Sequence, residues 1–117
     1  MPDSSTPRFF QGVFAFEGQG LDAPYLLDDS LTYTVPPGAE TQPVYFRAGN
    51  SSDELVYVSL IRDGKAMRHF PIGAKAHTHV SLRVVEDLLS DTVLELFVGA
   101  PKGLVGMIVV DTGLIEI

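Results

Sequence analysis

The 117-residue chain contains no cysteine. It therefore has no disulfide framework, no thiolate metal site, no thiol nucleophile and no cysteine-ligated iron–sulfur cluster. It also lacks a basic segment leading into a long apolar run, and no apolar run reaches the length that spans a bilayer. We expect a cytoplasmic protein with no membrane partner, because a chain without disulfides suits a reducing compartment.

Basic residues are scarce: eight lysines and arginines stand against fifteen acidic residues, which gives a formal charge of −7. A negative chain opposes the phosphate neutralisation on which nucleic-acid binding depends. Anionic membrane surfaces are disfavoured for the same reason. The composition therefore favours partners that are proteins or small molecules.

Segments with the helical period are nearly absent, and only residues 85–91 have room for one helical turn. Eight or nine short segments instead alternate apolar and polar residues, with turn-forming residues between them at roughly ten-residue spacing. This pattern predicts an all-β fold, an antiparallel Greek-key β-sandwich of the immunoglobulin-like or jelly-roll-like kind. We expect one domain over residues 8–117, preceded by a disordered tail at residues 1–7.

Turn-forming residues predict how the strands connect. Residues 49–53 are expected to join 43–48 and 54–62 in a hairpin, and the Asp63-Gly64 pair predicts a type I′ turn into the next strand. Residues 18–30 are expected to form a loop.

A further turn is expected at residues 111–113. Their sequence, Asp-Thr-Gly, is the triplet of aspartic proteases, but only four residues follow it, whereas those enzymes continue with most of their fold.

All three histidines lie in residues 65–84, which we expect to form one hairpin that turns at residues 71–75. In that hairpin His69 would lie opposite His77 and Met67 opposite His79, on the same polar face. Three imidazoles with an open fourth position are typical of a catalytic zinc site, and a thioether suits copper. The alternative interpretation is a mildly basic surface stripe that docks a partner.

Two strands are apolar on both faces, residues 8–17 and 104–110. A strand of a two-layer sandwich has one core-facing side, so the second apolar side needs another cover. The chain has few residues left to supply one. We therefore expect a homo-oligomer interface made by five side chains: Phe9, Val13, Val105, Met107 and Val109.

The function expected from the sequence is that of a non-catalytic, self-associating assembly module. Its expected partners are further copies of itself, with another protein as a second candidate, and no cofactor or catalytic residue is assigned. The alternative is a zinc- or copper-binding protein, a small hydrolase or lyase, that uses the histidines. A third hypothesis is a small-ligand or sugar site near Asp28, Tyr25 and Tyr33.

Overall fold

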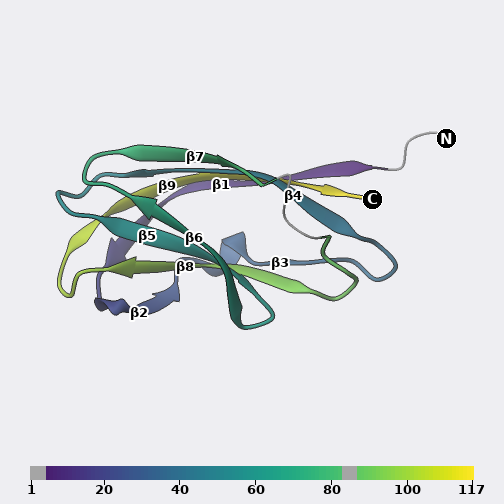
Figure 1. Cartoon of the computed structure of the whole chain (residues 1–117), viewed down its shortest axis with the longest axis horizontal. Helices are drawn as coiled ribbons and strands as arrows, with labels where there is room; N and C mark the ends of the chain where they lie inside the picture. The colour runs from purple at the N-terminus through teal and green to yellow at the C-terminus, as the bar shows by residue number, and fades with distance from the viewer. Residues whose placement is uncertain (1–4, 83–86) are drawn as a thin grey trace.

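The computed structural model describes residues 5–82 and 87–117, which form two antiparallel β-sheets packed face to face (Figure 1). The strands are β1 (Thr6–Glu17), β2 (Gly20–Leu26), β3 (Tyr33–Thr34), β4 (Thr41–Asn50), β5 (Val56–Arg62), β6 (Lys65–Ile72), β7 (His77–Ser81), β8 (Val93–Ala100) and β9 (Val105–Glu116). A 3-10 helix, η1 (Asp29–Leu31), precedes β3.

The strand order identifies the kind of sandwich. One sheet has the order β1-β9-β4-β7, and the other has the order β2-β8-β5-β6, with β3 also paired to β8. A four-stranded and a five-stranded sheet whose eight main strands interleave in this way form a jelly roll. The predicted antiparallel Greek-key sandwich is confirmed, and the jelly roll is the form it takes.

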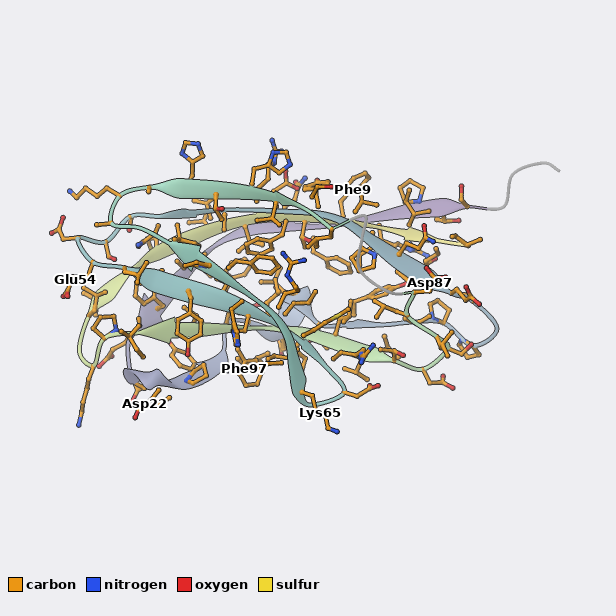
Figure 2. All side chains as sticks on the ribbon, viewed as in Figure 1. Phe9, Asp22, Glu54, Lys65, Asp87 and Phe97 are labelled. Carbon is orange, nitrogen blue, oxygen red and sulfur yellow. The ribbon has the colours of Figure 1, made fainter. Side chains whose placement is uncertain are left out.

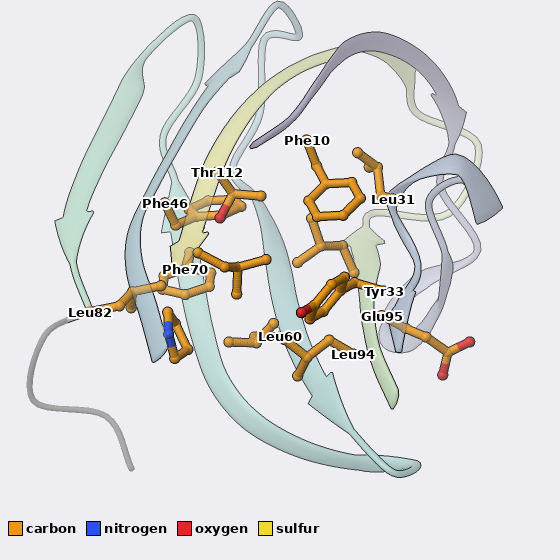
Figure 3. Close-up of a pocket in the computed structure, with 13 residues that line it drawn as sticks. Phe10, Leu31, Tyr33, Phe46, Leu60, Phe70, Leu82, Leu94, Glu95 and Thr112 are labelled. Atoms are coloured by element: carbon orange, nitrogen blue, oxygen red, sulfur yellow. The ribbon is translucent and has the colours of Figure 1, made fainter. Parts of the chain in front are cut away.

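The core lies between the sheets and is filled by the inward residues of both. Phe46 of β4 and Phe70 of β6 stack across it, with ring centroids 4.2 Å apart. Figure 3 shows these rings beside a cavity of about 20 Å³, which has room for roughly one water molecule. This cavity is too small for a ligand, so any functional site has to lie on the surface.

The predicted turn at Asp63-Gly64 is confirmed. Both residues have positive φ, 49° and 82°, as a type I′ turn requires, and the turn joins β5 to β6. Asp63 also accepts a hydrogen bond from the backbone N–H of Val93 through its side chain, 2.9 Å long. This contact holds the turn against the start of β8.

Two other predicted hairpins are wrong. The segments 43–48 and 54–62 belong to β4 and β5, which lie in different sheets, and so do β6 and β7 from the expected histidine hairpin. In each case the connecting residues cross from one sheet to the other. The alternating pattern cannot reveal this, because apolar side chains face the core whether two strands are neighbours in one sheet or opposed across the sandwich.

A buried asparagine explains why both connections cross at the same end. The side-chain amide of Asn50 donates to the carbonyls of Glu54, Ile72 and Gly73 at 2.9–3.2 Å, and its oxygen accepts from the N–H and hydroxyl of Ser52. These bonds bind the 50–54 connection to the end of β6. Asn50 thus occupies the point where the two crossings meet.

Several boundaries also differ from expectation. The expected loop at 18–30 contains β2 and η1, and residues 111–113 do not turn but continue β9. The described part of the expected helical turn, residues 87–91, contains a bridge from Leu88 to Thr41 and a turn, while residues 85–86 lie outside the described residues. In the expected tail, Thr6 and Pro7 pair with β9, and residues 1–4 lie outside the described residues.

One carboxylate is buried at the end of β9. Glu116 accepts a hydrogen bond from the hydroxyl of Tyr33 at 2.6 Å and forms an ion pair with Arg8 at 3.1 Å. The Tyr33 bond first, and then Arg8, hold the pKa of Glu116 below its ordinary value. Burial first, and then the bond to Glu116, raise the pKa of Tyr33 to about 12.

Because folding lowers the pKa of Glu116, we expect the folded chain to lose stability in acid. The pKa of this carboxylate is lower in the folded chain than in the unfolded chain, so its contribution is complete above the unfolded pKa and disappears as the pH falls through the folded pKa. Between about pH 5 and about pH 3 the melting temperature should fall more steeply for the wild type than for Glu116→Gln, which cannot titrate. Parallel curves in thermal unfolding followed by circular dichroism would contradict the assignment.

Candidate functional site: the outer face of the β1-β9-β4-β7 sheet

The candidate site is the solvent-facing side of the β1-β9-β4-β7 sheet, called the outer face from here on. Figure 2 shows Phe9 on this side of the molecule and Phe97 on the other sheet. All five side chains predicted to form an interface are exposed: Phe9 (59%), Val13 (60%), Val105 (67%), Met107 (38%) and Val109 (51%). Large apolar side chains with this exposure, gathered on one face, are typical of a contact surface.

The strand register places these side chains beside one another. Val13 lies directly opposite Val109, Ala15 opposite Met107, and Glu17 opposite Val105. Since opposed residues share a face, β1 and β9 present one apolar band along the outer face. The apolar alternation of both strands, read from the sequence, corresponds to this band.

A polar cluster lies at the centre of the same face. Asp111 of β9 accepts hydrogen bonds from the Tyr45 hydroxyl at 2.7 Å and from the Gln11 side-chain amide at 3.2 Å, and it forms an ion pair with Arg47. Arg47 first, and then Tyr45, hold the pKa of Asp111 below its ordinary value. Burial first, and then the bond to Asp111, raise the pKa of Tyr45.

This cluster leaves the face nearly neutral. Asp111 stays ionised beside Arg47, so the two charges cancel, and Tyr45 stays uncharged. A carboxylate that accepts from three donors has little capacity left to take a proton from a substrate. The cluster is therefore better suited to orienting side chains at a contact than to acid–base catalysis.

Glycines create hollows beside the apolar side chains. The ring of Tyr45 lies over Gly113, where a Cβ would come within 2.5 Å of it. At Gly49 a Cβ would meet only the Cβ of His77, at 4.0 Å, and a shallow depression of about 390 Å³ opens there. The outer face thus offers both projecting side chains and hollows that could receive them.

The four members of this polar cluster were not predicted from the sequence. Arg47 and Tyr45 alternate on β4, and Asp111 was assigned to a turn. One feature of the sequence could have identified the cluster. Asp111 is a charged residue among apolar outward residues, so it needs a polar partner on the neighbouring strand.

The histidines separate into two groups. His77 and His79 lie on β7 at the edge of the outer face, where His79 packs edge-on against Tyr45 with centroids 6.0 Å apart. His69 and Met67 lie on β6, in the other sheet. The three-histidine arrangement on a 65–84 hairpin is therefore not formed, because residues 73–76 carry the chain from one sheet to the other.

No alternative metal site appears in its place. Among residues 5–82 and 87–117, no group of three or more histidine, aspartate or glutamate side chains lies close enough to hold a metal ion. His69 is instead hydrogen bonded through Nδ1 to the hydroxyl of Ser59, at 2.6 Å, and packs edge-on against Tyr57. Ser59 is buried, whereas His69 is exposed.

The residues of the third hypothesis have structural partners. The Tyr25 hydroxyl bonds to the backbone of Glu17, the Tyr33 hydroxyl is buried against Thr41, and Asp28 caps the 3-10 helix through Ser30. The Tyr25 contact lies at the Glu17 end of β1, and the Tyr33 contact lies near Glu116, at the other end of that strand, so these residues do not form one site. The cavity that includes Tyr33 is the small one in the core.

Comparisons with known proteins support the fold alone. No family model matches the chain, and no curated protein matches it. Among solved structures, it is similar to a chain of infectious bursal disease virus, strain Gt, with a TM-score of 0.51 and 11% identity over 97% of this chain and 33% of the viral chain. An exo-β-1,3-galactanase of Phanerochaete chrysosporium is more weakly similar, with a TM-score of 0.42 and 12% identity over 98% of this chain and 30% of the enzyme.

The chain thus spans about a third of the length of these structures. At such low identity the similarity to the viral chain supports the β-sandwich and says nothing about activity. Among the described residues, no helix has the length and apolarity needed to cross a bilayer.

Proposed function

We propose that this chain is a non-catalytic assembly module that associates with a second copy of itself through the outer face of the β1-β9-β4-β7 sheet. The observation that carries the proposal is the set of exposed apolar side chains on β1 and β9, which flank the Gln11–Asp111 pair on one face. Removing such a band from water is the main source of association free energy. We further propose that the module acts in the cytoplasm, in keeping with its lack of cysteine.

Charge supports an identical partner. Two chains of formal charge −7 repel each other, so they need a contact face with few acidic groups. Of the acidic side chains on the described strands of this sheet, only Glu17 and Asp111 are at outward positions, and Asp111 is paired with Arg47. Depletion of charge at the centre of a patch is typical of interfaces.

The size of the face also supports a second copy. The four strands have 12, 12, 10 and 5 residues, so at ~3.4 Å per residue and ~4.8 Å per strand their outer face covers about 640 Å². Stable interfaces bury about 800 Å² on each partner. A two-fold axis across the strands would bring the apolar band of one copy onto that of the other.

A single charge on β9 is expected to separate the copies. Val109→Lys places an ammonium in the apolar band, and losing a buried valine costs about 1.5–3 kcal/mol in each copy, so the association constant should fall at least ~100-fold. Sedimentation velocity over a concentration series measures this change. The wild type should contain more than one chain, and a strictly monomeric wild type would contradict the proposal.

A matched control separates the face from general surface charge. Leu89 is 61% exposed but lies outside the two sheets, so Leu89→Lys adds the same charge and should leave the association unchanged. A second variant, Gly49→Arg, fills the depression near His77 without a backbone clash and should weaken association as Val109→Lys does. If Val109→Lys, Leu89→Lys and Gly49→Arg all change association by the same amount, the outer face is not the contact surface.

A further inference from the structure

The central part of the free edge of β1, residues 9–16, has none of the features that protect a sheet edge. β1 pairs with β9 on one side, and in residues 5–82 and 87–117 no strand pairs with its other side. Its register with β9 runs without a shift over all twelve residues, and residues 9–16 contain no charge and no proline. An uncharged, regular edge strand of this length readily accepts another strand.

The other edge strands are protected. β6 carries Lys65, Arg68 and Pro71 and a shift in register, and β2 carries Pro24 and a shift of its own. β7 has only five residues. Proteins use these features against edge-to-edge pairing, and residues 9–16 of β1 lack all of them.

Hydrogen bonds at the end of β1 show which backbone groups face the open side. The N–H of Glu17 donates to the Tyr25 hydroxyl at 3.0 Å, and that hydroxyl donates to the Glu17 carbonyl at 2.9 Å, so the backbone groups of Glu17 point away from β9. The direction alternates along an antiparallel strand. The same outward direction therefore applies to four more residues: Phe9, Gln11, Val13 and Ala15.

The open stretch has a defined end on each side. At one end Pro7 has no N–H to offer, and at the other Tyr25 already occupies the groups of Glu17. Gly12 is the midpoint between Pro7 and Glu17. The open edge is therefore symmetric about Gly12.

We propose that β1 pairs antiparallel with β1 of a second copy, about a two-fold axis at Gly12. In this register Pro7 lies opposite Glu17 of the other copy, and every outward N–H and C=O of residues 9–15 finds a partner. Phe9 lies opposite Ala15, so these apolar side chains meet across the axis, and Gln11 lies opposite Val13. The two four-stranded sheets join into one sheet of eight strands.

This edge contact is independent of the proposed face contact. It uses the backbone at the side of the sheet, whereas the face contact uses side chains on its outer surface. Because each chain has one β1, the contact closes as a dimer and does not propagate into a fibre. If the two-fold axes of the two contacts cross at right angles, the assembly with both contacts contains four chains, and loss of either contact leaves two.

A proline on the open side tests the edge. Ala15→Pro removes an outward N–H while sparing the bonds to β9, and Ala15→Val is the control that keeps the N–H. By sedimentation velocity the wild type and Ala15→Val should contain four chains, Ala15→Pro and Val109→Lys two, and the Ala15→Pro/Val109→Lys double variant one. A folded Ala15→Pro with the mass of the wild type would overturn the edge contact.

If Ala15→Pro fails to fold, amide hydrogen exchange tests the edge contact instead. In Val109→Lys, where only the edge contact remains, the amides of Phe9, Gln11 and Val13 should exchange at least ~100-fold more slowly than open edge amides. Rapid exchange at these positions in the associated wild type would overturn edge pairing and leave the face contact standing. A wild type that is a single chain at all concentrations would overturn both.

Discussion

Replacing Asn50 by alanine is expected to lower the free energy of unfolding by about 3 kcal/mol. The change leaves the buried carbonyl of Ile72 and the buried N–H of Ser52 without their side-chain partner, and it also removes the bond to the Gly73 carbonyl. Each unsatisfied buried group costs about 1–3 kcal/mol. For a domain of this size the melting temperature should fall by about 15 °C.

The neighbouring residue supplies the control. Ser51 is exposed and makes a single side-chain hydrogen bond, accepting from the N–H of Met107 at 2.8 Å, so Ser51→Ala should cost less than about 1.5 kcal/mol. Both variants are compared by urea unfolding at equal concentration, because association also stabilises the folded chain. If Asn50→Ala is no worse than Ser51→Ala, then Asn50 does not hold the two crossing connections together.

Asn50 also shows why part of the fold could be predicted and part could not. Alternation along each strand depends on local sequence, so the β-sandwich and the exposed band at Phe9 and Val109 follow from it. Whether a connection turns back or crosses to the opposite sheet depends on contacts between distant residues. The bonds from Asn50 to Ile72 and Gly73 span more than twenty residues, and no local pattern predicts them.

The outer face, too, could be predicted from the sequence only in part. Its apolar side chains were identifiable because a strand that is apolar on both sides has too few core positions for all of them. Its central polar cluster could not be identified from the sequence. The Asp111-Thr-Gly113 sequence is typical of a turn, whereas in the structure it is extended and the Tyr45 ring lies over Gly113. The outward position of Asp111 depends on the register of β9 with β4, which the sequence pattern does not contain.

The ion pair on the outer face leads to the second large expected effect. Asp111→Asn removes the negative charge and leaves the Arg47 guanidinium uncompensated in each copy. An unpaired charge in an interface costs about 2–5 kcal/mol, so association should weaken ~100-fold or more, which sedimentation velocity detects. The stability of the isolated chain should change by less than about 1 kcal/mol, because the Arg47 side chain is 55% exposed.

The double variant Arg47→Gln/Asp111→Asn decides whether charge is the cause. It removes both charges and keeps side chains of similar size, so the face is neutral again and most of the lost association should return. If the double variant associates as poorly as Asp111→Asn, geometry and not charge balance controls the contact. If Asp111→Asn associates as well as the wild type, this ion pair stays hydrated in the assembly and the outer face is not the surface that is buried.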